Sequence, residues 1–194
     1  MSDKFWLVIH ENFGAFSIVT IAYISAYAIT SGLIEPLQSH FIPNVSQLIG
    51  LLFLPHGVRV FCFFFYGIRG FFYTLPAAYL TWYVALLQLE VPFHFLSPII
   101  SLIACYVGVL VTRKIFRKTS YSKSMSSWKI ITVAGVIGSF LNGVGLSFLN
   151  EGTNTSLSVL GYMLGDMAGL FICMVIVMYL LRFLRFYRSG FEKL

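Results

Sequence analysis

Two charged side chains lie within apolar stretches of the sequence, where a charge must find a partner. Of 13 Lys and Arg residues, only Arg59 lies well inside such a stretch, and of 7 Asp and Glu residues, only Asp166 does. Charges within a bilayer are costly, so they usually face the interior of a helix bundle and pair there. At a rise of about 1.5 Å per residue, Arg59 lies about 18 Å and Asp166 about 14 Å from the outer ends of their helices. We therefore predict that they form an ion pair between two membrane helices.

Other polar groups are expected close to this pair. His56 precedes Arg59 by three residues and shares its helix face, and Asn142 lies about 10 Å from the outer surface. Pro55 and Gly57 should loosen the helix around His56, which is tolerated in a membrane where the backbone lines a cavity or is buried in protein. We expect a polar pocket reached from the outer side, whose ligand-binding candidates are His56, Arg59, Asn142 and Asp166. A purely structural role, in which these groups fix the register of the helices, is the alternative.

The reactive residue types form no catalytic or metal-binding pattern. Cys62, Cys105 and Cys173 lie far apart within apolar segments and lack the spacing of a metal site. They are interpreted as small apolar packing residues. The sequence has no pairing of a nucleophile with a base and no phosphate-binding loop. We therefore expect no enzyme activity, no metal and no cofactor.

The composition indicates an integral membrane protein. Hydrophobic residues make up 58% of the 194 residues and charged residues only 10%, whereas soluble domains carry about 25% charged residues. The net charge of +6 comes from residues at the ends of the apolar segments, so the expected partner is the lipid bilayer and not a nucleic acid. Residues 1–194 are interpreted as one transmembrane domain.

Six apolar segments are long enough to span a hydrocarbon core, which takes roughly 20 residues. They are Phe13–Ile34, Gln47–Tyr66, Phe71–Gln88, Leu96–Thr112, Ile130–Leu149 and Leu157–Leu184. They are continuously apolar, whereas the strands of a membrane barrel alternate apolar and polar residues, so helices are favoured. The sequence predicts an all-α polytopic protein with six transmembrane helices.

The basic residues predict that both chain ends lie in the cytoplasm. The loop at 113–129, the C-terminal tail, the N-terminus and the turn at Arg69 hold the Lys and Arg outside the spans, while the other three loops hold Glu35, Glu90 and Glu151 instead. Because Lys and Arg concentrate on the cytoplasmic side, this alternation predicts a multi-pass protein of the cell inner (plasma) membrane, N-in and C-in. The basic loop at 113–129 is interpreted as a topology determinant, or as a contact for anionic headgroups or an acidic partner.

Small residues recur every fourth position in the last two segments. The fifth has Gly135, Ser139 and Gly143, and the sixth has Gly161, Gly165 and Gly169. Small residues on one face let two membrane helices approach closely. We expect these two helices to form a tight hairpin on the two faces.

Two stretches of the sequence resemble parts of the MASE1 membrane sensory domain. Leu54-Pro55-His56-Gly57, with the apolar run that continues through Gly67, Arg69 and Gly70, resembles its Pro-x-Gly helix start, Gly-Arg turn and following helix. The stretch from Leu164 to Leu170 resembles its late Gly-Asp-x-x-Gly helix, in matching order. The motif positions carried over are Pro55, Gly57, Gly165, Asp166 and Gly169. The chain departs from the family in having six predicted helices where about eight are usual, and in Arg59.

The resemblance implies a bacterial inner-membrane sensor, which here would be a stand-alone, non-enzymatic sensory or accessory module that signals through a partner. A second interpretation is the substrate-binding or permease component of a small-solute transporter. The helix number is similar to that of the vitamin-binding subunits of energy-coupling-factor transporters, and Ala22-x-x-x-Ala26 resembles their docking face. A third interpretation is a membrane chaperone or assembly factor. The oligomeric state stays open.

Overall fold

The computed structural model is all-helical over the residues that it describes, which are 2–41, 50–88, 94–118, 127–149 and 155–191. Five of its helices are long and apolar enough to cross a membrane: His10–Phe41, Arg69–Gln88, Ser97–Phe116, Ser127–Leu149 and Val159–Tyr187. The prediction of an all-α membrane protein is therefore confirmed at this level. The second of the six predicted spans is the one that differs.

The first helix continues well beyond its predicted bounds of 13–34. Helix α1 (Ser2–Ile29) runs into a π-helical turn, η1 (Thr30–Ile34), and then into α2 (Glu35–Phe41). In η1 the backbone N–H of Glu35 donates to the carbonyl of Thr30, five residues back. Pro36 follows and has no N–H with which to continue the α-helical pattern, which accounts for a π-bulge at this point. The bulge turns Glu35 toward the interior of the bundle.

The second predicted span, Gln47–Tyr66, is wrong in its length. The helix, α3, covers only Leu54–Tyr66, with Pro55 in its first turn; residues 47–49 lie outside the described residues. Its 13 residues extend about 20 Å, which is short of the roughly 30 Å of a hydrocarbon core. Residues 50–53 approach α3 as irregular backbone. Gly67, at a φ of 57°, then reverses the chain.

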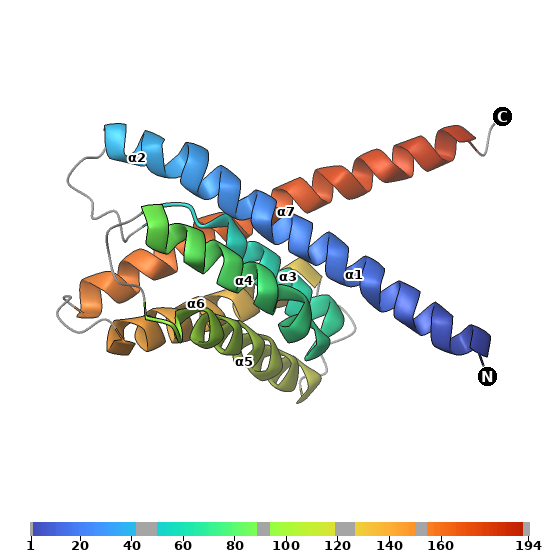
Figure 1. Cartoon of the computed structure of the whole chain (residues 1–194), viewed down its shortest axis with the longest axis horizontal. Coiled ribbons are helices and arrows are strands. Elements are labelled where there is room, and N and C mark those ends of the chain that lie inside the picture. The colour runs from blue at the N-terminus through green and yellow to red at the C-terminus, as the bar shows by residue number, and fades with distance from the viewer. Residues whose placement is uncertain (1, 42–49, 89–93, 119–126, 150–154, 192–194) are drawn as a thin grey trace.

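The remaining helices match the predicted segments and extend them. They are α4 (Arg69–Gln88), α5 (Ser97–Lys118), α6 (Ser127–Leu149) and α7 (Thr155–Phe191). The chain runs back and forth along the bundle, so the start of α1 and the end of α7 lie toward the same end of the molecule (Figure 1). The end of α5 and the start of α6, which flank the basic loop, lie toward that end as well.

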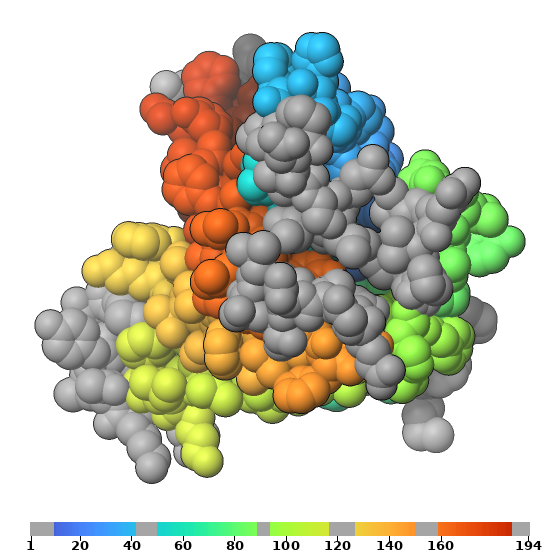
Figure 2. All heavy atoms as spheres, turned by 90° about the vertical axis from the view of Figure 1, so that its left-hand side faces the viewer, coloured from blue at the N-terminus to red at the C-terminus, as the bar shows by residue number. Residues whose placement is uncertain are grey.

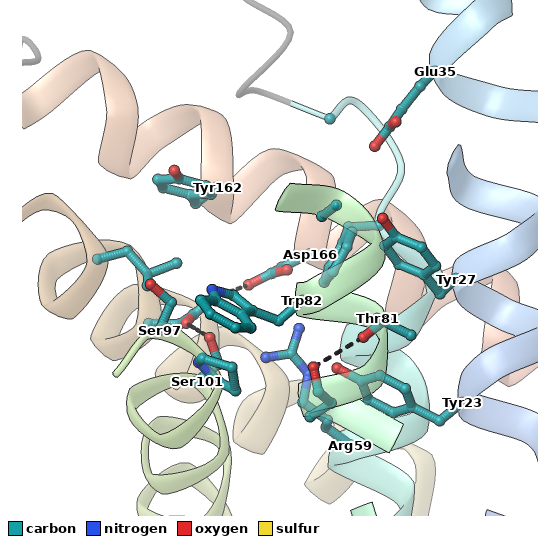
Figure 3. A pocket seen from close by; sticks show the side chains of 17 residues that line it. Tyr23, Tyr27, Glu35, Arg59, Thr81, Trp82, Ser97, Ser101, Tyr162 and Asp166 are labelled. Atoms are coloured by element: carbon teal, nitrogen blue, oxygen red, sulfur yellow. Dashed lines mark hydrogen bonds between the residues drawn. The ribbon is translucent and has the colours of Figure 1, made fainter. Parts of the chain in front are cut away.

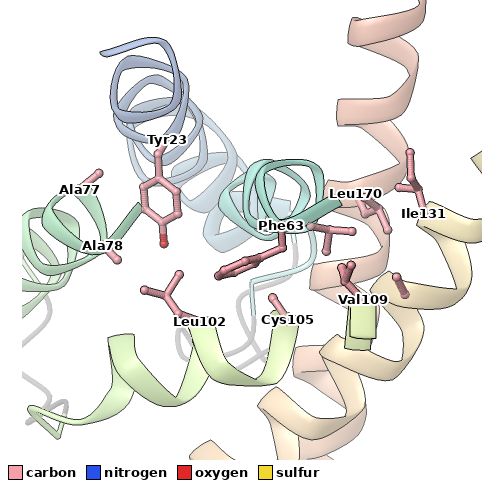
Figure 4. Close-up of a cluster of buried hydrophobic side chains, with 11 residues drawn as sticks. Tyr23, Phe63, Ala77, Ala78, Leu102, Cys105, Val109, Ile131 and Leu170 are labelled. Carbon is pink, nitrogen blue, oxygen red and sulfur yellow. The ribbon is translucent and has the colours of Figure 1, made fainter. Parts of the chain in front are cut away.

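The short helix α3 lies at the centre of the bundle and contacts α1, α4, α5, α6 and α7. Its Val60 and Phe63 are fully buried and belong to the main apolar cluster. Figure 4 shows Phe63 of α3 among Tyr23 of α1, Leu102 of α5 and Leu170 of α7. Because other helices surround α3, its shortness exposes little backbone to lipid.

The bundle is apolar outside and partly polar inside. Large hydrophobic side chains, such as Phe72 of α4 and Phe148 of α6, point outward along the helices that could span a membrane. The buried polar side chains are Thr30, His56, Arg59, Thr74, Thr81, Ser97, Ser101, Thr112, Ser139, Asn142, Ser147 and Asp166. This distribution fits a lipid environment, which offers polar groups no hydrogen bonds and thus drives them inward.

The small residues of α6 and α7 permit close contacts, but not as one symmetrical hairpin. Gly143 of α6 meets the backbone of Val159 in α7, and Gly135 meets the side chain of Leu170. A closer backbone approach joins α6 to α5, where a Cβ on Gly108 would lie 2.6 Å from the carbonyl oxygen of Ala134. The expectation of a hairpin between the two ladders therefore describes only part of the packing. Ser139 and Gly161 are both buried.

The glycine face of α7 has another partner than expected. A Cβ on Gly165 would collide with the carbonyl of Gly50, and one on Gly169 with the carbonyl of Phe53. The N–H of Phe53 donates to the carbonyl of Gly165 over 2.9 Å. The two glycines thus hold the irregular backbone before α3 against α7, because only a helix face without side chains admits another backbone so closely.

Candidate functional site

A polar pocket lies between the helices at the end of the bundle where α4 ends and α5 begins. Its volume is about 170 Å³, below the roughly 300–1,000 Å³ of pockets for drug-sized ligands. The pocket is polar and aromatic, and its lining includes Tyr23, Tyr27, Glu35, Phe53, Arg59, Thr81, Trp82, Ala85, Ser97, Ser101, Asn142, Tyr162 and Asp166. Figure 2 shows this end of the molecule, where blue residues of α2, green residues of α4 and orange residues of α6 and α7 lie around one face.

Two hydrogen bonds and one close polar contact connect four helices beside the pocket. The hydroxyl of Ser101 in α5 donates to Oδ1 of Asn142 in α6 over 2.7 Å. Nδ2 of Asn142 donates to Oδ2 of Asp166 in α7 over 3.1 Å. Nδ1 of His56 in α3 lies 3.2 Å from the same oxygen. These contacts join side chains from α5, α6, α7 and α3, so the network holds four helices relative to one another.

His56 is completely buried behind Asp166. With Nδ1 directed at a carboxylate oxygen, the ring is best assigned the tautomer whose proton is on Nδ1. Nε2 then needs no acceptor; it lies beside the backbone of Gly135 and makes no hydrogen bond to a described residue. The thiol of Cys105 is 3.7 Å from Nδ1. His56 therefore orients the carboxylate and does not itself line the pocket.

Arg59 lies one turn after His56 on α3 and lines the pocket. The side chain is only 3% exposed, and its Nε donates to the carbonyl of Pro55 over 3.4 Å. The guanidinium lies 5.3 Å from the ring centre of Phe53, within the range of a cation–π contact. The two terminal nitrogens make no hydrogen bond to a described residue. Figure 3 shows this group pointing toward the side of the pocket where Trp82 and Asp166 lie.

The four ligand-binding candidates from the sequence come together, but the expected ion pair takes another form. Arg59, Asn142 and Asp166 line one pocket, and His56 lies directly behind it. Over the described residues, no salt bridge joins Arg59 to Asp166; the carboxylate is held by His56 and Asn142 instead. The prediction of a direct pair between residues 59 and 166 is thus not met. Both charges still face one cavity.

Two further donors of the pocket lining find no acceptor among the residues that the structure describes. Nε1 of Trp82 in α4 and the hydroxyl of Ser97 at the start of α5 are buried and make no hydrogen bond to any residue that the structure describes. Ser97 is 8% exposed. A buried polar group without a partner carries a free-energy cost, so two such groups beside one cavity mark a place where an acceptor is missing.

The sequence did not single out several residues of the pocket. Ser97 and Ser101 are spaced one helical turn apart at the start of α5, and this spacing is the signal that would have placed both on one face. Glu35 was assigned to an outer loop, but the π-bulge brings it to the pocket. Tyr23 and Trp82 carried no signal, because aromatic residues are common throughout these helices.

The arrangement suits reversible binding of a small polar molecule. It combines one guanidinium, the carboxylates of Asp166 and Glu35, and the aromatic rings of Tyr23, Tyr27, Phe53, Trp82 and Tyr162. Among the described residues, no group of three or more His, Cys, Asp or Glu side chains is placed to hold a metal ion.

Comparison of the chain with protein-family models, with curated proteins and with solved structures finds no match.

Proposed function

We propose that this chain is a non-enzymatic multi-pass membrane protein, a sensory or accessory module that binds a small solute in the pocket between α3, α4, α5 and α7. The single observation that carries the proposal is the placement of Arg59 and Asp166 on one cavity of about 170 Å³ without a salt bridge between them. Charges used only to hold helices together would be expected to meet directly. Two separate charges facing a cavity are typical of a binding site.

The proposal of a sensory role rests on the resemblance of two stretches to the MASE1 domain and on the position of the pocket. Asp166 lies on α7, whose last turns reach the end of the bundle that also carries the flanks of the basic loop. A ligand that alters the contacts of Asp166 would therefore act on a helix that extends to the proposed cytoplasmic face. A membrane or cytoplasmic signalling partner would dock there, and the bilayer of the cell inner (plasma) membrane is the proposed location.

The test is a screen of small solutes against the full chain purified in a maltoside detergent, read as a change in melting temperature. A solute present at 100 times its Kd should stabilise the protein by about 2.7 kcal/mol. Ala85→Trp fills the pocket from α4 and should abolish the shift. Leu87→Trp, on the exposed face of the same helix, is the matched control and should retain it. Solutes that shift both variants equally would contradict binding in this pocket.

A second candidate function, a component of a small-solute transporter, is favoured by one observation. Helix α3 begins inside the bundle, after irregular backbone at residues 50–53. Interrupted helices at a central site are a recurrent feature of transporters. Reconstitution into liposomes separates the two functions, because a transport component, alone or with its energising partner, accumulates the solute identified in the screen. A sensory module binds the solute but leaves the liposome interior without it.

A further inference from the structure

We propose that the pocket recognises a small zwitterion, a molecule that carries one oxyanion and one ammonium group, as free amino acids do. This inference rests on the proposed function and names the class of solute. It follows from three properties of the lining: donors and one acceptor that make no hydrogen bond to a described residue, and charges of both signs.

The donors line the same pocket as the guanidinium of Arg59. Arg59 offers two terminal nitrogens without hydrogen bonds to described residues. Trp82 on α4 and Ser97 on α5 each present a buried donor that is likewise unpaired among the described residues. A planar oxyanion such as a carboxylate accepts from a guanidinium through two parallel bonds and has further lone pairs for a neighbouring N–H and O–H. One ligand group would thus satisfy donors from α3, α4 and α5 together.

The acceptor that the ligand would use belongs to the Asp166 carboxylate, whose charge is opposite to that of Arg59. Both polar contacts of the Asp166 carboxylate are made to Oδ2: the hydrogen bond from Asn142 and the 3.2 Å approach of His56 Nδ1. Oδ1 makes no hydrogen bond to a described residue, and Asp166 lines the pocket at only 2% exposure. An ammonium group has three donors and no acceptor, so it fits this oxygen. The aromatic rings of the lining, among them Tyr27 and Tyr162, also favour a cation.

The lining presents charges of both signs. It carries the guanidinium of Arg59 and the carboxylates of Asp166 and Glu35. A simple organic anion would supply a partner to the guanidinium but none to the carboxylates, and a simple organic cation would supply a partner to a carboxylate but none to Arg59. A zwitterion supplies a partner to both charges. The shared chemistry has two sources, a free amino acid and the headgroup of phosphatidylethanolamine.

The experiment compares three molecules that differ by one group each: L-phenylalanine, phenylpropionate, which lacks the ammonium, and phenethylamine, which lacks the carboxylate. Binding is measured by calorimetry on the full chain in maltoside detergent, with L-leucine, 4-methylpentanoate and 3-methylbutylamine as an aliphatic series. We expect the zwitterion of at least one series to bind about tenfold or more tightly than both of its relatives, because each relative loses a charge-assisted hydrogen bond.

Conservative substitutions in the pocket test where the ligand binds, because they remove one hydrogen-bond donor each and are not expected to disturb the fold. Trp82→Phe keeps the ring and removes the N–H, and Ser97→Ala removes the hydroxyl. Each substitution should weaken the binding of the zwitterion and of its carboxylate relative by about tenfold, and should leave the affinity for the amine unchanged. The matched controls are Tyr83→Phe, on the exposed face of α4, and Ser147→Ala. Ser147 is 8% exposed, as Ser97 is, and its hydroxyl is also unpaired among the described residues, but it lies outside the pocket lining.

The outcomes separate this inference from the proposed function. If the carboxylate or the amine binds as tightly as the zwitterion and Trp82→Phe weakens its binding, the proposal of a zwitterionic ligand is wrong. The proposal of a solute pocket then still holds. If no molecule of either series binds, the zwitterion is also wrong, and the wider solute screen decides on the pocket. Short-chain phosphatidylethanolamine, added below its micellar concentration, identifies the source. Displacement of the amino acid supports recognition of a headgroup, and absence of displacement supports recognition of a free amino acid.

Discussion

Nδ1 of His56 lies 3.2 Å from Oδ2 of Asp166 and connects the central helix α3 to α7 across the buried interior of the bundle. The two residues are 110 positions apart in the sequence (166 − 56). Their contact places the carboxylate on the pocket, while Arg59, the opposite charge, forms no salt bridge with any residue that the structure describes. The first prediction therefore concerns which basic residue is coupled to Asp166.

Two double-mutant cycles distinguish the partners of Asp166. The cycle of His56→Leu with Asp166→Leu should give a coupling of about 1–3 kcal/mol, because the two buried groups lie 3.2 Å apart. The cycle of Arg59→Leu with Asp166→Leu should give a clearly smaller coupling, since no salt bridge joins them. Unfolding is followed in detergent by tryptophan fluorescence. A larger coupling in the cycle with Arg59 would show that the direct pair predicted from the sequence forms after all.

Gly169→Ala should destabilise the protein by about 1–3 kcal/mol, as overpacking of an interior usually does. The added Cβ would meet the carbonyl of Phe53, and a backbone cannot move aside as a flexible side chain can. The control is Gly14→Ala in α1, where a Cβ meets nothing within 4 Å. This variant should be neutral or up to about 1 kcal/mol more stable, because alanine favours helix. Equal melting temperatures for the two variants would refute the tight contact between α7 and residues 50–53.

Pro36→Ala should convert η1 to regular α-helix, because the new N–H restores the missing donor. Loss of the extra residue of a π-bulge rotates the preceding turn by roughly 100°, so Glu35 should leave the pocket. A cysteine at position 35 measures this as a change in its rate of alkylation by a water-soluble maleimide. The reference is the variant that has the cysteine at position 35 and keeps Pro36. Ser39→Cys, on the exposed side of α2, is the control for general reactivity. An unchanged rate at position 35 would mean that Pro36 does not cause the bulge.

Cysteine labelling tests the proposed orientation in the membrane. Ser39→Cys on α2 should react with an impermeant maleimide added to intact cells, and Lys114→Cys at the end of α5 should react only after the cells are opened. Both positions are exposed, and the three native cysteines are buried, so the background should be low. Labelling of both positions from the same side would disprove the arrangement inferred from the basic residues.

The elements of the fold follow from the sequence wherever an apolar run coincides with a regular helix. The segments at 71–88, 96–112, 130–149 and 157–184 all lie within or close to helices α4 to α7. The run at 47–66 is also apolar, but hydropathy cannot distinguish a full span from irregular backbone followed by a short helix, because both are built from apolar residues. Pro55 is the local signal for where the short helix begins, since proline is favoured in the first turn of a helix.

The site follows from the sequence as far as its charges are concerned. Arg59 and Asp166 were expected inside the bundle because a charge in an apolar segment has few other places to go. The pairing of Asp166 with His56 was not accessible, because the two basic residues lie one turn apart on α3 and only the relative rotation of α3 and α7 decides between them. The donors of Trp82 and Ser97 that make no hydrogen bond to a described residue could not be predicted either. Whether they find an acceptor depends on which helices meet in the folded chain.

The contact of residues 50–53 with α7 has a consequence for how the protein is made. The N–H of Phe53 donates to the carbonyl of Gly165, so a backbone donor near the start of the chain obtains its acceptor only after more than half of the remaining sequence has been synthesised. Unlike the backbone groups inside a helix, this N–H has no acceptor within its own segment, and an unsatisfied backbone group is costly in lipid. The irregular stretch before α3 can therefore be buried at its final position only once α7 has been made.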